Sequence, residues 1–384
     1  MDALMLPSNW QQVRLGDILS YEQPTKYLVA TTQYLQKGFT PILTAGKTFI
    51  LGYTNDKHGI YTNIPVIIFD DFTTDSKMVN FPFKVKSSAI KILSLRDNNQ
   101  ADLKYIYEKL TLLKHQVTDH KRYWIDEFSN IEIPLPPLNE QSAITDILSA
   151  LDNYLHALRA LILKKESVKK ALSFELLSQR KRLKGFNQAW QQVRLGTYKY
   201  RRGSFPQPYG NPQWYSDNGM PFVQVYDVGE NFKLTQRTKQ KISKIAQPMS
   251  VFVPKNSVII TLQGTIGRVA LTQYDCYCDR TILIFDNNTL NDVNKYFFVL
   301  SLFTKFEEEK RKADGSIIKT ITKQTLKDFE IPLPPLNEQS AIADILSALD
   351  KEIASLKNKK RQFENIKKAL NHDLMSAKIR VFKK

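Results

Sequence analysis

The sequence IPLPPLNEQSAITDILSALD occupies residues 133–152, and IPLPPLNEQSAIADILSALD occupies residues 331–350. Nineteen of these 20 positions are identical, and the exception is Thr145 against Ala343. A repeat of this length and identity within one chain indicates a tandem duplication. The duplication decides the architecture of the protein.

Two shorter repeats show what the duplicated unit contains. WQQVRLG begins at Trp10 and again at Trp190, and KKAL begins at Lys169 and again at Lys367. The long stretch and KKAL are displaced by 198 residues, whereas WQQVRLG is displaced by 180, so the second copy has 18 more residues between its WQQVRLG and PLPPLNEQ. The intervening segments, roughly 17–130 and 197–328, show no comparable identity. Each copy therefore keeps a constant frame around a variable insert.

A long helix is expected after each PLPP. Pro136 and Pro137 disfavour helix at and before themselves, and Asn139 is a good N-cap. Apolar residues then recur at steps of four and three, which is typical of a coiled-coil seam. In the first copy these are Ile144, Leu148, Leu151, Leu155, Leu158 and Ile162, and after a gap at Lys164 and Lys165 they are Val168, Leu172 and Leu176. In the second copy they are Ile342, Leu346, Leu349, Ile353, Leu356, Phe363, Ile366 and Leu370, interrupted by Lys360.

Each apolar stripe needs a partner, and the stripe of the other copy is the obvious one. For the stripes to meet, the second helix must run back along the first, which gives an antiparallel pair with the variable segments at opposite ends. The N-terminal WQQVRLG is then expected near the end of the second helix, in a circular layout. The alternative is that each helix packs separately on its own globular segment.

The variable segments read as mixed strand and helix. Residues 66–69, 251–253 and 258–260 are predicted strands, and residues 105–114 and 293–309 are predicted helices. The predicted fold is α+β: two mixed α/β modules joined by two long antiparallel coiled-coil helices in a pseudo-two-fold tandem repeat. The predicted boundaries are 1–130 for module 1, 131–185 for the first helix, 186–328 for module 2 and 329–384 for the second helix.

The composition favours a polyanionic partner. The chain carries 55 Lys and Arg against 38 Asp and Glu, a formal net charge of +17, and phosphate contacts gain from counterion release. A merely solvated basic surface is the alternative. The two cysteines, Cys276 and Cys278, form neither a disulfide framework nor a zinc-ligand set, and are expected to be reduced thiols in a cytoplasmic protein. Neither a signal peptide nor a membrane-spanning stretch is visible, so no membrane association is expected.

The sequence offers no catalytic centre. None of the 14 glycines lies two positions from another, so no G-x-G loop is present to approach a cofactor. Asn211-Pro212-Gln213-Trp214 resembles the Asn-Pro-Pro-aromatic motif of adenine methyltransferases, but Gln replaces its third residue. Gly46-Lys47-Thr48 resembles the end of a P-loop whose first glycine is replaced by Pro41, and is interpreted as a turn.

Two PLPPLNEQ-x-x-I segments, each leading into a long helix and each preceded by a dissimilar module, resemble the specificity (S) subunits of type I restriction–modification systems. The stretches GKTFILGYT and IIFDDFT in module 1, and GMPFVQ and QGTIGRVAL in module 2, look like variants of the target recognition domains of that family. The resemblance covers nearly the whole chain. It implies a DNA-binding subunit with no catalytic activity of its own, in which each target recognition domain reads one half of a split site.

The resemblance also implies partners. Two methyltransferase (M) subunits would dock around the helices, and a restriction and motor (R) subunit would join for cleavage of double-stranded DNA. No cofactor is expected on this chain, because S-adenosylmethionine, ATP and Mg²⁺ would be bound by the partner subunits.

Candidate DNA contacts concentrate in residues 231–256, which carry basic residues and no acidic one. The candidates there are Lys233, Arg237, Lys239, Gln240, Lys241 and Lys244, with amide side chains suited to base edges. Further candidates are Lys47, Lys77 and Lys84 in module 1, and Arg311 and Lys319 in module 2. A solvated loop is the alternative for the basic segment. For the whole chain, the alternatives are an orphan specificity subunit without methyltransferase partners, or a structural coiled-coil scaffold with two protein-binding modules.

Overall fold

The structure is a computed structural model that describes residues 6–44, 48–113, 122–229, 231–264, 266–312 and 323–381. It divides into two compact units: unit 1 comprises residues 1–160 and 357–384, and unit 2 comprises residues 161–356. Module 1 belongs to unit 1 and module 2 to unit 2. Within the described part of the chain, no helix combines the length and apolar character that crossing a bilayer requires.

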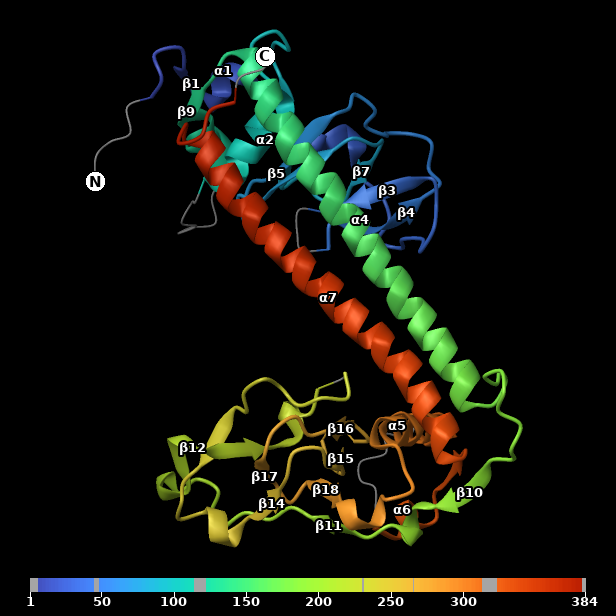
Figure 1. Cartoon of the computed structure of the whole chain (residues 1–384). Helices are drawn as coiled ribbons and strands as arrows, with labels where there is room; N and C mark the ends of the chain where they lie inside the picture. Colours follow the sequence, from blue (N-terminus) through green and yellow to red (C-terminus); the bar gives the residue numbers. More distant parts are fainter. Residues whose placement is uncertain are drawn as a thin grey trace. The chain divides into compact units, whose positions relative to one another are not determined.

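Two helices of 40 residues follow the PLPP segments, and both are labelled in Figure 1. They are α4 (Leu138–Leu177) and α7 (Leu336–Met375), each about 60 Å long at 1.5 Å per residue. The predicted helix is confirmed, with one correction at its start. Asn139 is already inside the first turn, where its side chain accepts a hydrogen bond from the backbone N–H of Glu140 at 2.9 Å.

The helices run antiparallel within each unit. In unit 1 the rings of Tyr154 on α4 and Phe363 on α7 have centroids 4.6 Å apart. In unit 2 the ammonium of Lys165 on α4 lies 2.8 Å from a carboxylate oxygen of Glu352 on α7. Higher residue numbers on α4 thus meet lower numbers on α7, as the sequence predicts.

The seam between the helices differs from the predicted one at two positions. Val168 and Ile366 were expected on it, but their side chains are 45% and 50% exposed. The four-and-three spacing instead continues through Lys165 and Lys169, whose ammonium groups pair with acidic residues of α7. Lys165 of the predicted lysine gap is therefore part of the seam, because a lysine can occupy a seam position when a carboxylate faces it.

Each module contains a four-stranded antiparallel sheet of the same strand order. In module 1 the order is β2-β8-β5-β6, formed by Leu19–Glu22, Ile90–Leu95, Val66–Asp70 and Ser76–Val79. In module 2 it is β11-β18-β15-β16, formed by Tyr200–Arg202, Ile282–Phe285, Val258–Thr261 and Val269–Leu271.

Each module also contains a second sheet, and the two second sheets have related topologies. In module 1 its order is β4-β3-β7, formed by Ile50–Thr54, Thr40–Leu43 and Lys84–Val85. In module 2 it is β13-β12-β17-β14, formed by Gln240–Ile242, Tyr215–Val223, Cys276–Cys278 and Val251–Val253. The central strand has one antiparallel and one parallel neighbour in both. The longer second copy thus has an added edge strand, β14, and modules without comparable sequence identity share a topology.

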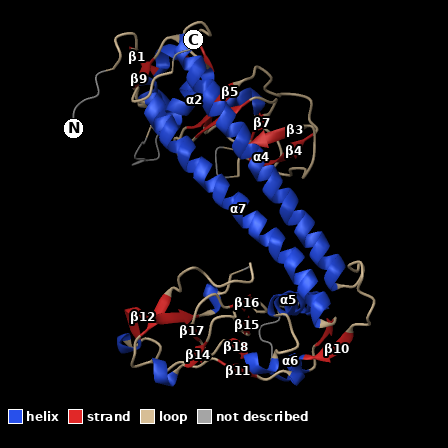
Figure 2. Cartoon of the chain, in the orientation of Figure 1, coloured by secondary structure: helices blue, strands red, loops and turns tan. Residues whose placement is uncertain are grey.

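Two of the predicted strands, β5 and β15, are buried on both faces, which explains their continuous apolar sequences. The third, β14, is an edge strand on which Phe252 is 42% exposed. On β5, Ile67 and Phe69 pack with the helices of unit 1, whereas Val66 and Ile68 pack against the second sheet. On β15, Val258 and Ile260 face the helices of unit 2, and Ile259 faces the second sheet. Figure 2 shows the strands of each module in red and the helices in blue.

Shorter elements complete the modules. The helices α1 (Leu15–Ile18), α2 (Leu103–Leu112) and α3 (Tyr123–Asp126) belong to module 1, and α5 (Lys295–Lys312) and α6 (Lys323–Lys327) to module 2. The two repeated segments of each copy pair with one another as antiparallel strands. These are β1 (Gln11–Arg14) with β9 (Glu132–Leu135), and β10 (Gln191–Arg194) with β19 (Glu330–Leu333), in the same register.

Candidate nucleic-acid interface

The glutamate of the first repeated Asn-Glu-Gln connects the WQQVRLG segment to the residues that follow α7 in unit 1. Glu140 is buried at the start of α4 and accepts a hydrogen bond from Trp10 Nε1 at 3.2 Å. The guanidinium of Arg380, beyond the end of α7, donates to the same carboxylate at 2.8 and 3.0 Å, and the hydrogen bond raises the pKa of Arg380. Arg380 also donates to Asn9 Oδ1 at 3.1 Å. Asn9 and Trp10 therefore lie beside the segment that follows the second helix, as the circular layout predicts.

The counterpart residues of unit 2 form the same hydrogen bonds. Glu338 accepts from Trp190 Nε1 at 3.1 Å and from Arg182 at 2.7 and 3.2 Å. Only 1% of the Glu338 side chain is exposed, so its charge is compensated by the arginine rather than by water. Arg182 follows α4 as Arg380 follows α7. The repeat thus encodes one Trp-Glu-Arg contact that is formed twice.

The glutamine that follows each of these glutamates fixes the module to its long helix. Gln141 Oε1 accepts from the backbone N–H of Asp102, the N-cap of α2, at 2.8 Å, and its Nε2 donates to Pro136 O at 2.8 Å. In unit 2, Gln339 accepts from the N–H of Asn294 at 2.9 Å and donates to Pro334 O at 2.9 Å. The identical side chain therefore positions α2 in one module and α5 in the other.

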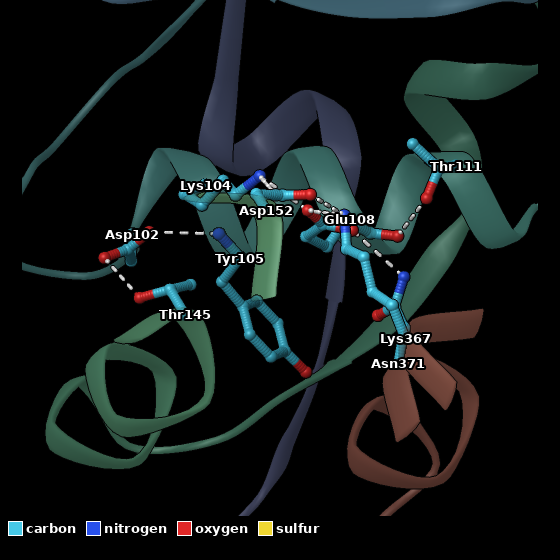
Figure 3. Close-up of polar contacts among 9 residues, drawn as sticks. All are labelled: Asp102, Lys104, Tyr105, Glu108, Thr111, Thr145, Asp152, Lys367 and Asn371. Atoms are coloured by element: carbon cyan, nitrogen blue, oxygen red, sulfur yellow. Dashed lines mark hydrogen bonds and ion pairs between the residues drawn. The ribbon is translucent and has the colours of Figure 1, made fainter. Parts of the chain in front are cut away.

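The polar cluster shown in Figure 3 lies in unit 1. Glu108 of α2 is buried and is paired with Lys104 at 2.6 Å, with Lys367 at 3.4 Å and with Asn371 at 3.0 Å. Asp152 completes the cluster, lying 2.9 Å from Lys104 and 2.6 Å from Lys367. Each carboxylate thus has two cationic neighbours, which offset the cost of removing it from water.

Module 2 contacts the long helices through different side chains. Asp350, the repeat counterpart of Asp152, accepts from the phenol of Tyr296 on α5 and from Lys169 of α4 at 2.5 Å. Burial, followed by the hydrogen bond to Asp350, raises the pKa of Tyr296, which keeps the phenol a donor. The frame is constant, whereas each module supplies its own contacts to it.

The basic segment of module 2 lies at the surface. The predicted DNA contacts Lys233, Arg237, Lys239, Lys241 and Lys244 are exposed, and Gln240 is half-buried on β13. Lys241 donates to the backbone carbonyl of Asp217 at 2.8 Å. Arg311 is also exposed, near the end of α5, whereas Lys319 lies outside the described residues.

The structure describes two of the three predicted contacts of module 1, and they differ in exposure. Lys77 is exposed on β6, and Lys47 lies outside the described residues. The Lys84 side chain is only 5% exposed, and its ammonium lies 2.6 Å from Asp56 Oδ2 and 2.7 Å from His58 O. The hydrogen bond from Lys84 holds the pKa of Asp56 below its usual value. Lys84 therefore ties β7 to the 56–58 loop and is separate from the exposed surface.

Sequence reasoning missed the surface group that lies beside this basic segment. Gln224 and Tyr226 flank Val225 at the end of β12, and the Tyr226 phenol donates to Gln224 Oε1. The ammonium of Lys239 lies 5.1 Å from the centroid of the Tyr226 ring. Tyr226 and Lys239 are 13 positions apart in the sequence, and no periodicity links them, so their proximity had no sequence signal.

The chain repeats one set of frame contacts around two modules of dissimilar sequence. Comparisons with known proteins identify the class of protein that has this organisation. The family model of the type I restriction modification DNA specificity domain matches residues 7–165 and again residues 206–365. The chain belongs to this family, and as a member it is a DNA-recognition subunit rather than an enzyme.

Curated relatives agree with the family assignment. The chain is 33% identical over 361 residues to the type I restriction enzyme EcoR124I/EcoR124II specificity subunit of Escherichia coli, covering 88% of this chain and 85% of that protein. It is 26% identical over 418 residues to the type I restriction enzyme MjaVIII specificity subunit of Methanocaldococcus jannaschii, covering 99% and 95%. The similarity thus extends over both modules and both helices.

Solved structures show the same fold. The S subunit of a type I restriction–modification system from M. genitalium has a TM-score of 0.64 at 17% identity, over 97% of this chain and 98% of that one. A chain from a structural study of complex assembly and conformational transition of a type I system has a TM-score of 0.58 at 18% identity, over 97% and 99%.

Proposed function

We propose that this chain reads a bipartite site in double-stranded DNA, with one module for each half-site, and docks methyltransferase subunits on its helices. One observation carries the proposal. Two modules of one topology but different sequence are held by frame contacts that are the same in both, through Glu140 and Gln141 in one unit and Glu338 and Gln339 in the other. A constant frame with divergent inserts suits a protein that presents two different readers to one ligand.

The surface chemistry of module 2 suits a DNA ligand. The exposed cations of residues 231–256 are not balanced by any acidic residue in that segment, so phosphate contacts there would release counterions. The half-buried Gln240 stands next to two of these lysines, where an amide could reach a base edge.

The helices offer matching apolar positions for partners. Leu138 on α4 and its counterpart Leu336 on α7 are exposed, as are Val168 and its counterpart Ile366. Each unit thus carries one leucine and one β-branched residue of this exposed set. Two copies of a methyltransferase subunit would find equivalent residues in the two units, and a restriction and motor subunit would join that complex.

In this scheme the chain itself binds no cofactor, and the partner subunits hold S-adenosylmethionine, ATP and Mg²⁺. The complex would act in the cytoplasm, where the cell's DNA lies. This chain supplies the sequence specificity and its partners supply the chemistry.

The test compares the methylated DNA of a strain that carries this gene and its methyltransferase partners with that of the same strain lacking only this gene. The proposal expects a two-part adenine-methylation motif that disappears with the gene. Replacing residues 197–328 by the module of a relative should change one half of the motif and leave the other half unchanged. An unchanged methylation pattern without the gene would refute the proposal and favour a protein-binding scaffold.

A further inference from the structure

Arg280 is exposed two residues beyond β17, a strand of the second sheet of module 2. The central carbon of its guanidinium lies 5.4 Å from the centroid of the Tyr209 ring, within the range of a cation–π interaction. Among the residues that the structure describes, none accepts a hydrogen bond from this guanidinium or forms an ion pair with it. Its N–H donors therefore remain available to a ligand.

The Tyr209 ring that Arg280 contacts is held by hydrogen bonds. Its phenol donates to Asp279 Oδ2 at 2.6 Å, and its backbone carbonyl accepts from the phenol of Tyr215 at 2.7 Å. Asp279 is 3% exposed, and its Oδ1 accepts from the backbone N–H and the hydroxyl of Thr281 at 2.8 and 2.6 Å. Burial, followed by the hydrogen bond to Asp279, raises the pKa of Tyr209, so the phenol stays a donor. Tyr209 is therefore a positioning residue for the guanidinium.

Arg280 lies at the same end of the sheet as the basic segment of module 2. The strands β12 and β17 are parallel and pair Val223 with Cys278, and the N–H of Asp279 continues this pairing by donating to Val223 O at 3.0 Å. The chain therefore leaves both strands at one end of the sheet. The strand β13 is antiparallel to β12 and begins at that end, so Lys239, which precedes β13, lies there too.

The carboxylates of Asp227 and Asp279, close to this end of the sheet, are buried. Asp227 is 2% exposed, and it accepts from the backbone N–H groups of Gln224 and Lys239, both at 2.9 Å. Asp279 is engaged by the hydrogen bonds given above. Neither carboxylate is therefore exposed to repel the phosphates of DNA, whereas the exposed Lys239 and Arg280 carry positive charge.

Module 1 has a different residue at the position that corresponds to Arg280. There the N–H of Lys86 donates to Leu43 O at 3.0 Å across the parallel pair of β3 and β7, as the N–H of Asp279 does across β12 and β17. Ser87 therefore occupies the place of Arg280. Two modules that read different half-sites need different side chains at corresponding positions, and this position meets that requirement.

The guanidinium of an arginine suits one base in particular. Guanine presents two acceptors, O6 and N7, in the major groove, and an arginine forms paired hydrogen bonds with both. A phosphate contact carries no sequence information and can be made by a lysine as a point charge. Support of the guanidinium by a fixed aromatic ring is more useful for the paired contact, because that contact depends on orientation.

We propose that Arg280, positioned by Tyr209, reads the guanine of one G·C base pair in the half-site recognised by module 2. This inference rests on the proposed DNA-reading function and adds the residue and the base to it. Because the guanidinium is held over the ring before DNA binds, less side-chain freedom is lost on binding, which favours discrimination between bases.

The test determines the recognition motif of the assembled complex with Arg280→Ala, using the methylated DNA of a strain that carries this variant. We expect the preference for guanine at one position of one half-site to fall by about 10- to 100-fold, the discrimination that one paired contact gives. The other half-site should be unchanged and serves as an internal control. Arg194→Ala, which removes an exposed arginine of the frame strand β10, should leave both half-sites unchanged.

Two further variants separate a base contact from other roles. Arg280→Lys keeps the charge but loses the paired donors, so it should lose the guanine preference as Arg280→Ala does. Tyr209→Phe removes the hydrogen bond that fixes the ring, so it should weaken the preference at the same position by a smaller factor.

Three results would overturn the inference or its basis. If Arg280→Ala and Arg280→Lys keep the original preference at every position, or if Arg280→Lys alone restores it, Arg280 does not read a base although the protein still reads DNA. Loss of preference at a position other than a G·C pair would overturn the assignment of the base. If the unmodified complex recognises no two-part motif, the proposed function itself fails.

Discussion

Lys367 of α7 lies 2.6 Å from the carboxylate of Asp152 on α4 in unit 1. In unit 2 the counterpart Lys169 of α4 lies 2.5 Å from the counterpart Asp350 of α7. The same lysine-to-aspartate contact is therefore made twice, with the two helices exchanging roles. A duplicated sequence that pairs antiparallel with itself produces this pattern, because a contact between a residue of one copy and a residue of the other recurs with the two copies exchanged.

The first prediction concerns Asp152. Burial raises the pKa of its carboxyl, but hydrogen bonds from Lys367 and Lys104 more than reverse this, and the pKa is lowered overall. Its stabilisation is therefore present above the pKa of about 3.9 of the unfolded chain and is lost as the pH falls through the lower folded pKa. Asp152→Asn should lower the free energy of unfolding by about 1 kcal/mol at pH 7, since the pair is partly exposed to solvent.

Urea unfolding of the wild type and the variant at pH 7 and pH 2 measures this effect, and the difference should shrink in acid. Asp344→Asn, at an exposed position of α7, is the matched control and should change little at either pH. A constant difference between the wild type and Asp152→Asn at both pH values would contradict the assignment.

The second prediction concerns the repeated glutamine. Gln339→Leu removes the partner of the Asn294 N–H and of the Pro334 carbonyl, and each buried polar group left unpaired costs about 1–3 kcal/mol. The free energy of unfolding should fall by about 2–4 kcal/mol in urea titrations. Thr145→Ala is the control, because the second copy already carries alanine there, at Ala343, and it should cost less than about 1 kcal/mol. If Thr145→Ala lowered the free energy of unfolding more than Gln339→Leu does, the conclusion that the repeated glutamine fixes the module to its helix would be wrong.

The third prediction concerns Lys109 of α2, whose ammonium donates to the carbonyl of Met375 at 2.8 Å. Burial lowers its pKa to about 8. Between pH 8 and about 10.4 the unfolded chain holds this proton more tightly than the folded one, so this group makes stability rise with pH across that window, by up to about 3 kcal/mol.

Comparing the free energy of unfolding of the wild type and Lys109→Met from pH 7 to pH 10 isolates this contribution. The rise attributed to Lys109 should be missing from the variant. Lys77→Met, at an exposed position of β6, should follow the wild-type curve. If the free energy of unfolding changes with pH in the same way for the wild type and Lys109→Met, burial does not lower the pKa of this lysine.

The fourth prediction concerns the basic segment of module 2. Lys239→Glu combined with Lys241→Glu should weaken DNA binding by the assembled complex and make it less dependent on salt. Each lost phosphate contact lowers the slope of log affinity against log salt by about 0.9. Fluorescence anisotropy at several salt concentrations measures both quantities, with Lys351→Glu, a single charge reversal on α7, as a control outside the modules. Unchanged affinity and slope would mean that this loop faces away from DNA.

The fifth prediction concerns the division of labour with the partner subunits. The chain purified without partners should transfer no methyl group and bind no S-adenosylmethionine, because its sequence contains no glycine loop that could approach the cofactor. Isothermal titration calorimetry should give no saturable signal. Saturable binding by the pure chain would overturn the proposal that the partners hold the cofactor.

The contact between Tyr226 and Lys239 and the burial of Lys84 show where prediction from the sequence reached its limit. Lys84 was chosen because it is basic, but Asp56 lies 28 residues away in the sequence and 2.6 Å away in space. The charge of a residue is written in the sequence, whereas its exposure depends on which distant segment folds over it.

The sequence by itself determined the duplicated frame, the two long helices and their antiparallel pairing, because the repeat and the apolar steps of four and three are properties of the order of residues along the chain. Tertiary structure alone decided that Lys169 lies on the seam and Val168 outside it, and that Tyr226 meets Lys239. It also decided that two modules without comparable identity share one strand order. These features depend on contacts between segments far apart in the chain, and many different apolar sequences satisfy the same buried strand positions.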